Sequence, residues 1–278
     1  MFNNRAYKSI NFLTAFAYEV NGIFRAEGFY DGTILIHTNR TEFPDHPVPV
    51  VKLCQHGAPI VDLHFVVTDD SGISATDNCL LLASASYDQR IILWTLKFGK
   101  WKPLKIYTLD DEYCTSISSD QRGEKITFSL SNGVLHHVNV QNCADSELDA
   151  GKTYDDGVIY ACIDPLQSEK FIIGNDQGEF VIFQGDGKAI KTLKVSDSAI
   201  RYIDMSDKIV ITCDDSSILV IDRINYQITH AETAIKKANF RPVMTKIEPI
   251  TEALITLSDD GQISHLMRFP NGSYREML

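Results

Sequence analysis

Histidine, cysteine and acidic side chains are the groups in this sequence that could bind a metal ion or act as a catalytic base. The chain has 278 residues, with eight histidines and six cysteines. His136 and His137 are adjacent, so on a strand they point to opposite faces and cannot chelate one ion together. Four other histidines lack acidic or cysteine partners at ligand-like spacing: His46, His64, His230 and His265. We therefore expect no metal site and no cofactor.

The cysteines are scattered along the chain and form no C-x-x-C pair. They are Cys54, Cys79, Cys114, Cys143, Cys162 and Cys213. Such spacing favours free thiols over disulfides or a metal site, and free thiols are typical of a reducing compartment. The sequence therefore predicts a cytoplasmic protein.

These groups must be positioned by short strands, of which the stretch 81–101 gives the clearest example. Leu81 to Ser86 is apolar and then small, Tyr87 to Arg90 supplies turn residues, and Ile91 to Trp94 is β-branched and apolar. This pattern predicts a β-hairpin, and a single hairpin buries too little surface to be stable.

The hairpin recurs along the chain. Its turn residue, Asp88, aligns with one residue in each of five other segments. In chain order the six are Asp31, Asp88, Asn132, Gln177, Asp215 and Asp260, at intervals of 57, 44, 45, 38 and 45 residues. Repeats of about 40 to 45 residues are typical of WD-type β-propellers. The sequence predicts an all-β, six-bladed WD-type propeller that forms one domain over 1–278, with blade one at about 11–54 and blade six at about 242–278.

Three acidic residues could approach the central channel of such a ring: Asp62, Asp204 and Glu248. Some six-bladed propellers are hydrolases that use carboxylates or histidines there, although acidic residues near strand ends are also common at loop rims. The sequence has no G-x-S-x-G elbow, P-loop, HExxH or dinucleotide fingerprint. We expect a protein that is not an enzyme and has no small-molecule substrate.

Overall charge and hydropathy narrow the classes of partner. The net charge is −11, which disfavours a broad nucleic-acid footprint because phosphate binding needs a basic face. No segment is long and apolar enough to span a membrane, and the apolar run 10–18 is too short for an export signal. We read that run as the first inner strand of the ring.

The segments LCQHGAPIVDLHF and LLASASYDQRIILWTLKFGKW together carry a family resemblance. Their telling residues are His56, Pro59, Ser84, Ser86, Tyr87, Asp88, Trp94, Gly99 and Trp101. Over about fifty residues the chain resembles blade two of the small WD-repeat propeller shared by the COPII vesicle outer coat and the nuclear-pore Y-complex. It departs from that pattern at Gln55 and Thr95, where the family has Gly and Asp, and in later blades, which lack tryptophan.

The resemblance implies a structural tetrad and a mode of assembly. In WD repeats, residues matching His56, Ser84 (or Ser86), Asp88 and Trp94 form a hydrogen-bonded staple that fixes the blade. In the family, a larger α-solenoid coat or pore protein inserts a seventh blade between the first and last blades of an open ring. The expected function is then a non-catalytic scaffold subunit in the cytoplasm, at endoplasmic-reticulum vesicle coats and the nuclear envelope, which meets membranes only through its partners. The alternative is a closed WD adaptor in a ubiquitin-ligase, RNA-processing or signalling complex.

The first strand supplies the candidate residues for a partner seam: Phe12, Leu13, Phe16 and Tyr18. In a regular strand the three rings face one side and Leu13 the other. Such a face fits either a seam that a partner fills or an interface within this chain. Residues 1–8 could close the ring, although blade six has a fourth strand of its own at about 273–277.

Overall fold

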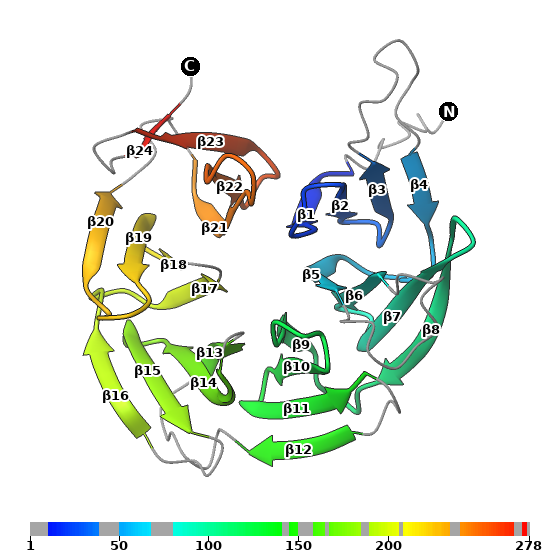
Figure 1. Cartoon of the computed structure of the whole chain (residues 1–278), viewed down its shortest axis with the longest axis horizontal. Helices are drawn as coiled ribbons and strands as arrows, with labels where there is room; N and C mark the ends of the chain where they lie inside the picture. The colour runs from blue at the N-terminus through cyan, green and yellow to red at the C-terminus, as the bar shows by residue number, and fades with distance from the viewer. Residues whose placement is uncertain are drawn as a thin grey trace, which may run out of the picture.

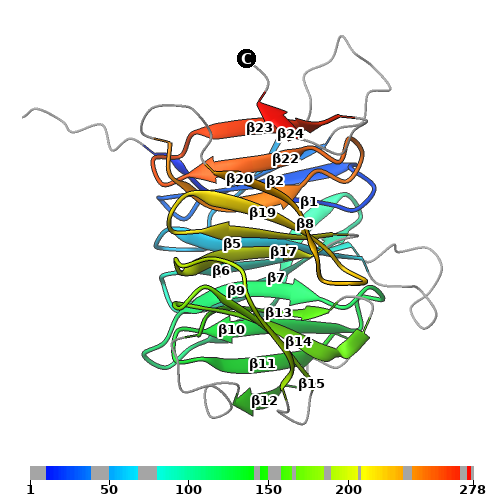
Figure 2. The same ribbon diagram turned by 90° about the vertical axis from the view of Figure 1, so that its left-hand side faces the viewer.

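Six antiparallel sheets form the fold, each built from four consecutive strands paired in chain order. This computed structural model describes residues 11–38, 50–67, 80–140, 145–149, 158–164, 167–184, 189–205, 208–233, 240–269 and 274–276. Figure 1 shows the sheets arranged as blades around a central axis, and Figure 2 shows the same ring from its side. The described residues contain no helix. The prediction of a six-bladed, all-β propeller is confirmed, and the architecture is consistent with a WD-type propeller.

The strands of each blade run from the inside of the ring outward. Blade 1 comprises β1 (Leu13–Tyr18), β2 (Phe24–Phe29), β3 (Ile34–Thr38) and β4 (Val50–Leu53). Blade 2 comprises β5 (Ile60–Val67), β6 (Leu80–Ser86), β7 (Arg90–Lys97) and β8 (Lys100–Thr108). Blade 3 comprises β9 (Cys114–Ser119), β10 (Lys125–Leu130), β11 (Val134–Asn139) and β12 (Asp145–Asp149).

The second half of the ring repeats this order. Blade 4 comprises β13 (Val158–Asp164), β14 (Gln167–Asn175), β15 (Glu179–Gln184) and β16 (Ala189–Lys194). Blade 5 comprises β17 (Ile200–Met205), β18 (Lys208–Cys213), β19 (Ser217–Asp222) and β20 (Ile228–Thr233). Blade 6 comprises β21 (Pro242–Ile247), β22 (Leu254–Ser258), β23 (Ile263–Arg268) and β24 (Tyr274–Glu276).

The repeat alignment places the turns correctly. All six aligned residues, from Asp31 to Asp260, lie between the second and third strands of their blades. These middle strands are packed on both faces by neighbouring blades, and β18 and β19 are accordingly β-branched and almost continuously buried. The core is therefore a series of layers between blades.

One boundary in the ring differs from the other five. It lies between blade 6 and blade 1, at the top of Figure 1, and we call it the seam. The inner strands of every other neighbouring pair of blades pack together along their length, from β1 against β5 to β17 against β21, whereas β21 and β1 make at most marginal contact. Within the described residues, blade 6 contains only its own four strands, and β24 pairs with β23 as predicted.

The alternation predicted for the first strand is wrong at one point. A bulge between Leu13 and Ala15 shifts the register, so Leu13 pairs with Phe29 while Phe16 pairs with Glu27. Directly paired residues share a face, and Leu13, Phe16 and Tyr18 therefore lie on the same side of the sheet. Phe12 precedes the strand and stacks on Tyr30, with ring centroids 4.8 Å apart.

Candidate functional site

The four tetrad residues of blade 2 form one hydrogen-bonded chain. His56 leads into β5, Ser84 lies on β6, Asp88 lies in the following turn and Trp94 lies on β7. His56 Nδ1 is 3.1 Å from both carboxylate oxygens of Asp88, and its Nε2 is 2.8 Å from Ser84 Oγ. The indole Nε1 of Trp94 donates to the same Ser84 oxygen over 2.9 Å. The chain thus ties the segment before the blade to three successive parts of it.

Ser86, the alternative serine of the tetrad, is used elsewhere. Its hydroxyl donates to the carbonyl of Ala58 over 2.9 Å and also accepts the amide of Asp88. Ser84 is therefore the tetrad serine, whereas Ser86 anchors the segment that precedes β5.

Burial and neighbouring hydrogen-bond donors shift the pKa values of the two ionisable tetrad residues. Burial lowers the pKa of His56 despite the adjacent carboxylate of Asp88, so the ring is neutral at pH 7. Burial alone would raise the pKa of Asp88, but the amide of Gly57 at 2.9 Å and the side chain of Arg90 hold it below its usual range. Because the side-chain polar atoms of the four tetrad residues have fixed partners, the geometry fits a structural staple.

A second polar network lies at the centre of the ring and joins four blades. Asp62 on β5 is fully buried and accepts the amide of Ile117 on β9 over 2.8 Å. Tyr202 on β17 donates its hydroxyl to Asp62 over 3.2 Å. Lys246 on β21 places Nζ 3.3 Å from Asp62 Oδ1 and 2.9 Å from the carbonyl oxygen of Leu63. A single carboxylate of blade 2 is thereby bound by blades 3, 5 and 6.

Lys246 reaches blade 2 because blade 1 carries only methyl groups in its path. The strand registers place Ala15 at the position of Asp62, and Ala17 at the position that holds His64 in blade 2 and Lys246 in blade 6. Both alanines are buried. The Lys246–Asp62 ion pair therefore spans the seam by passing blade 1.

The other two candidate channel acids accept backbone amides. Asp204 accepts the amide of Ile247 in the next blade over 2.9 Å, and burial raises the pKa of Asp204. Glu248 caps its own turn by accepting the amide of Thr251 over 2.7 Å. Asp62 and Asp204 do lie on inner strands, as predicted, but each is used to connect blades.

The network borders a cavity of about 470 Å³ at the channel mouth where the inner strands end. Its walls combine the apolar side chains of Tyr18, Phe65 and Ile247 with the charged side chains of Arg223 and Glu252. Arg223 is paired with Asp164, and Glu252 with Arg268. The cavity thus offers few charged groups that are not already committed to ion pairs.

We predict a pH dependence of stability that arises from His64. Burial lowers the pKa of this imidazole to about 3, with a smaller effect from Lys246, and its Nε2 lies 2.9 Å from Ser119 Oγ. The unfolded imidazole takes up a proton near its ordinary pKa of about 6.5, so stability should fall as the pH drops from about 6.5 towards 3, by at most about 1.4 kcal/mol per pH unit. Urea unfolding at pH 7 and pH 4.5 measures this loss. The His64→Gln variant should lose less over the same interval, and equal losses would contradict the assignment.

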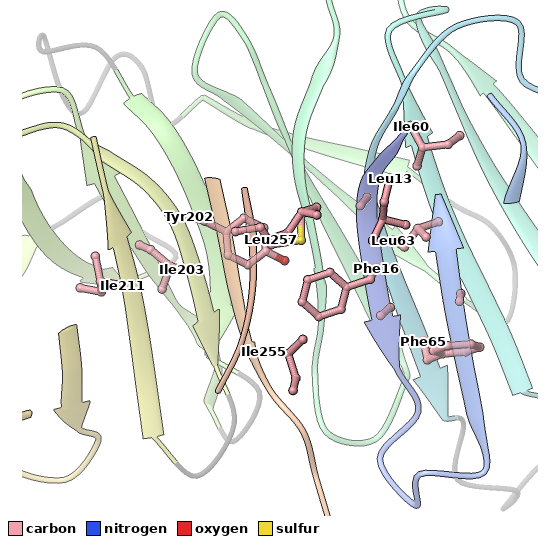
Figure 3. Close-up of a cluster of buried hydrophobic side chains, with 14 of the residues drawn as sticks. Leu13, Phe16, Ile60, Leu63, Phe65, Tyr202, Ile203, Ile211, Ile255 and Leu257 are labelled. Carbon is pink, nitrogen blue, oxygen red and sulfur yellow. The ribbon is translucent and has the colours of Figure 1, made fainter. Parts of the chain in front are cut away.

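The seam residues are already covered by this chain. Leu13 and Phe16 are buried, at 8% and 2% exposure, and Tyr18 is partly buried. In Figure 3 the ring of Phe16 points from β1 towards Leu257 and Ile255 of blade 6. Burial raises the pKa of the Tyr18 phenol, and the carboxylate of Glu248 across the seam acts in the same direction.

Two turns close the seam at its ends. A Cβ added to Gly261, in the β22–β23 turn, would lie 2.9 Å from Phe12 Cβ and 3.1 Å from the amide nitrogen of Leu13. Gly22, in the β1–β2 turn, approaches Ile250 in the same way. Gly178 of blade 4 packs equally tightly on Ser196, ahead of blade 5. The outer corners of the seam therefore resemble an ordinary boundary between blades, although the inner strands do not.

We predict that Gly261→Ala destabilises the protein more than Gly99→Ala. Both glycines have positive φ angles, 82° and 70°, but a Cβ at position 99 would meet nothing within 4 Å. The conformational cost is thus shared, and only Gly261→Ala adds overpacking, of about 1–3 kcal/mol. Parallel urea titrations of the two variants measure the difference. Equal losses would show that the seam is not packed at this turn.

The other cysteines and histidines that the structure describes do not assemble into a metal site. Cys54, Cys114 and Cys213 are free thiols. Among the residues that the structure describes, no three histidine, cysteine or acidic side chains gather as metal ligands, and no helix could cross a membrane. Cys79, Cys143 and His46 lie outside the described residues.

Comparison with known proteins adds no family to this geometry. No protein-family model matches the chain, and no curated protein is significantly similar to it in sequence. The propeller fold is suited in general to a protein-interaction scaffold, because a ring of blades presents two faces and a rim of loops and strand edges.

Proposed function

We propose that this protein is a non-catalytic scaffold subunit of a membrane-coat or nuclear-pore-type assembly, and that a larger α-solenoid protein contributes strands at the seam. The observation that carries the proposal is the seam itself. Among the residues that the structure describes, no segment links blade 6 to blade 1, the inner strands of the two blades are at most in marginal contact, and no strand of blade 1 joins the sheet of blade 6.

Blade 2 supports the same proposal. The tetrad is complete there, and the ring of Trp101 lies 6.1 Å from Phe24 of blade 1 and 6.3 Å from Phe65 of its own blade, between centroids. These are the residues on which the resemblance to the coat and pore propeller depends. A partner that supplied strands would gain main-chain hydrogen bonds and a large, lasting interface.

Insertion of a blade has a structural cost that defines how the seam must open. The turn contacts of Gly22 and Gly261 must separate, and the ion pair between Lys246 and Asp62 must break. Leu13 and Phe16 would then pack against the partner. The proposed location of the protein, in the cytoplasm at vesicle coats and the nuclear envelope, follows from the assembly and not from any membrane contact of its own.

Co-expression with candidate α-solenoid proteins, followed by size-exclusion chromatography, tests the proposal. We expect a stable complex to co-elute at one-to-one stoichiometry and to resist dilution, as an inserted blade requires. A protein that stays a soluble monomer with every solenoid candidate would overturn it.

The close turn contacts at Gly22 and Gly261 favour a second candidate, a closed WD adaptor that binds partners on its faces in a ubiquitin-ligase, RNA-processing or signalling complex. Affinity purification from cells with mass spectrometry separates the two functions. A solenoid partner supports the scaffold, whereas partners that bind without disturbing β1 and β21 support the adaptor.

A further inference from the structure

The outermost strand of blade 2, β8, is the longest of the six outermost strands and the most basic. It has nine residues, pairs only with β7, and leaves its other edge free of any described strand. Positions 97–108 contain four lysines and no acidic residue, in a chain whose net charge is −11. Lys97, Lys100, Lys102 and Lys105 are all exposed, and within the described residues none of them forms an ion pair.

Large apolar side chains accompany these lysines on the surface. Leu104 and Ile106 of β8 are 44% and 43% exposed, and Phe98 in the preceding turn is 89% exposed. An edge that serves only to prevent pairing has no need of exposed aliphatic residues. The combination of apolar and cationic side chains on one free edge is instead a surface that an acidic, extended segment can cover.

The main chain of β8 can pair with such a segment. The amide of Leu109 donates to the carbonyl of Gln89 over 2.8 Å, and the next pair in this phase is Tyr107, two residues earlier, with Ile91, two residues later. Alternate residues of an antiparallel pair point their N–H and C=O groups outward, so those of Ile106 and Thr108 face the free edge.

The turn before β8 determines which residues in the first half of the strand face the free edge. Phe98 and Gly99, with φ angles of 50° and 70°, form a two-residue turn closed by Lys97 and Lys100. Counting from that pair, Pro103 falls at an outward-facing position opposite Trp94, where its missing N–H costs no bond to β7. The edge loses a single donor at this point.

We propose that the free edge of β8 binds an extended, acidic segment of a partner protein by strand addition. The lysines select against a second copy of the same edge through like-charge repulsion and select for carboxylates at alternate positions of the added strand. Ile106 pairs with Ile92 and therefore lies on the other face from Lys102 and Lys105, which pair with Thr95 and Leu93, so Ile106 contacts the apolar residues between those carboxylates. This surface lies on blade 2, away from the seam, and does not depend on the function proposed for the seam.

A fluorescein-labelled nine-residue peptide of alternating Glu and Val tests the proposal by fluorescence anisotropy at low ionic strength. The peptide should bind the full chain saturably, and a Lys/Val peptide of the same length should not. Lys102→Glu with Lys105→Glu should weaken binding about tenfold or more, because two attractive cross-strand pairs become repulsive. The matched control is Lys191→Glu with Lys194→Glu on β16, the outermost strand of blade 4, which should bind like the wild type.

A second variant separates strand pairing from general charge attraction. Ile106→Pro removes an N–H that faces the free edge and none that bonds to β7, so the fold should be retained while peptide binding falls several-fold. Ile106→Thr keeps the N–H and serves as its control. Absence of peptide binding, equal losses from the β8 and β16 reversals, or full binding by Ile106→Pro with an unchanged melting temperature would each overturn the proposal. Dimers of the wild type that Ile106→Pro abolishes would also overturn it, in favour of a second copy as the occupant.

Discussion

Replacing Asp62 with alanine should lower the free energy of unfolding by about 3–5 kcal/mol, because the change leaves a buried lysine without its counter-charge. The substitution also removes the acceptor for Tyr202 and for the amide of Ile117, so blades 2, 3, 5 and 6 all lose a contact. Urea denaturation followed by circular dichroism measures the loss.

A double-mutant cycle isolates the ion pair from these other contacts. Lys246→Met alone should cost less than Asp62→Ala, since the remaining carboxylate keeps its amide donors from Leu63 and Ile117. Asp62→Ala combined with Lys246→Met should be more stable than the sum of the two losses predicts, by about 1 kcal/mol or more. Strict additivity would show that Lys246 and Asp62 do not interact across the ring.

Replacing Trp94 with alanine should cost about 3–5 kcal/mol, the usual loss for a large aromatic side chain removed from a core. The side chain is 2% exposed, and its indole is bonded to Ser84 within the tetrad. Trp94→Phe should keep most of the burial and lose about 1 kcal/mol through the missing hydrogen bond. Thermal and urea unfolding of both variants measure these losses.

Trp101→Ala is the matched control for the tetrad tryptophan. Trp101 is partly exposed at the edge of the core, where its ring packs near Phe24 and Phe65. Trp101→Ala should therefore lower the free energy of unfolding clearly less than Trp94→Ala does. Equal losses would mean that the tetrad contributes nothing beyond ordinary aromatic packing.

Local periodicity was enough to predict the fold, because each blade is formed by consecutive strands. The turn residues from Asp31 to Asp260 could be aligned by their spacing, and the apolar third strands followed at a fixed offset. The positions of His56, Ser84, Asp88 and Trp94 could be named because blade 2 keeps the full pattern. Blades that have lost the tryptophan still fold, since aliphatic residues such as Ile221 fill the same buried position.

Contacts between distant strands could not be predicted in the same way. Nothing in the local sequence indicates that Lys246 meets Asp62, which lies 184 residues earlier. The contact can be anticipated only when the inner strands of the blades are aligned with their bulges included. That alignment places alanines of blade 1 between Lys246 and Asp62. The bulge after Leu13 likewise overrode the simple alternation that had placed Leu13 opposite the aromatic rings.

A reversible covalent lock across the seam tests the central claim of blade insertion most directly. Cysteines introduced at positions 12 and 261 in a Cys54→Ser background would bridge the place where a Cβ on Gly261 lies 2.9 Å from Phe12 Cβ. This spacing is shorter than the roughly 3.8 Å that a disulfide prefers, so the two turns must move apart by about 1 Å, which also relieves the overpacking expected at position 261. The measurement is the affinity for the solenoid partner with the lock oxidised and then reduced, after mass spectrometry has verified the disulfide, with Cys54→Ser alone as the control. Our account predicts that the oxidised protein fails to bind and that reduction restores binding. Equal affinity in both states would contradict insertion at the seam and favour a closed ring.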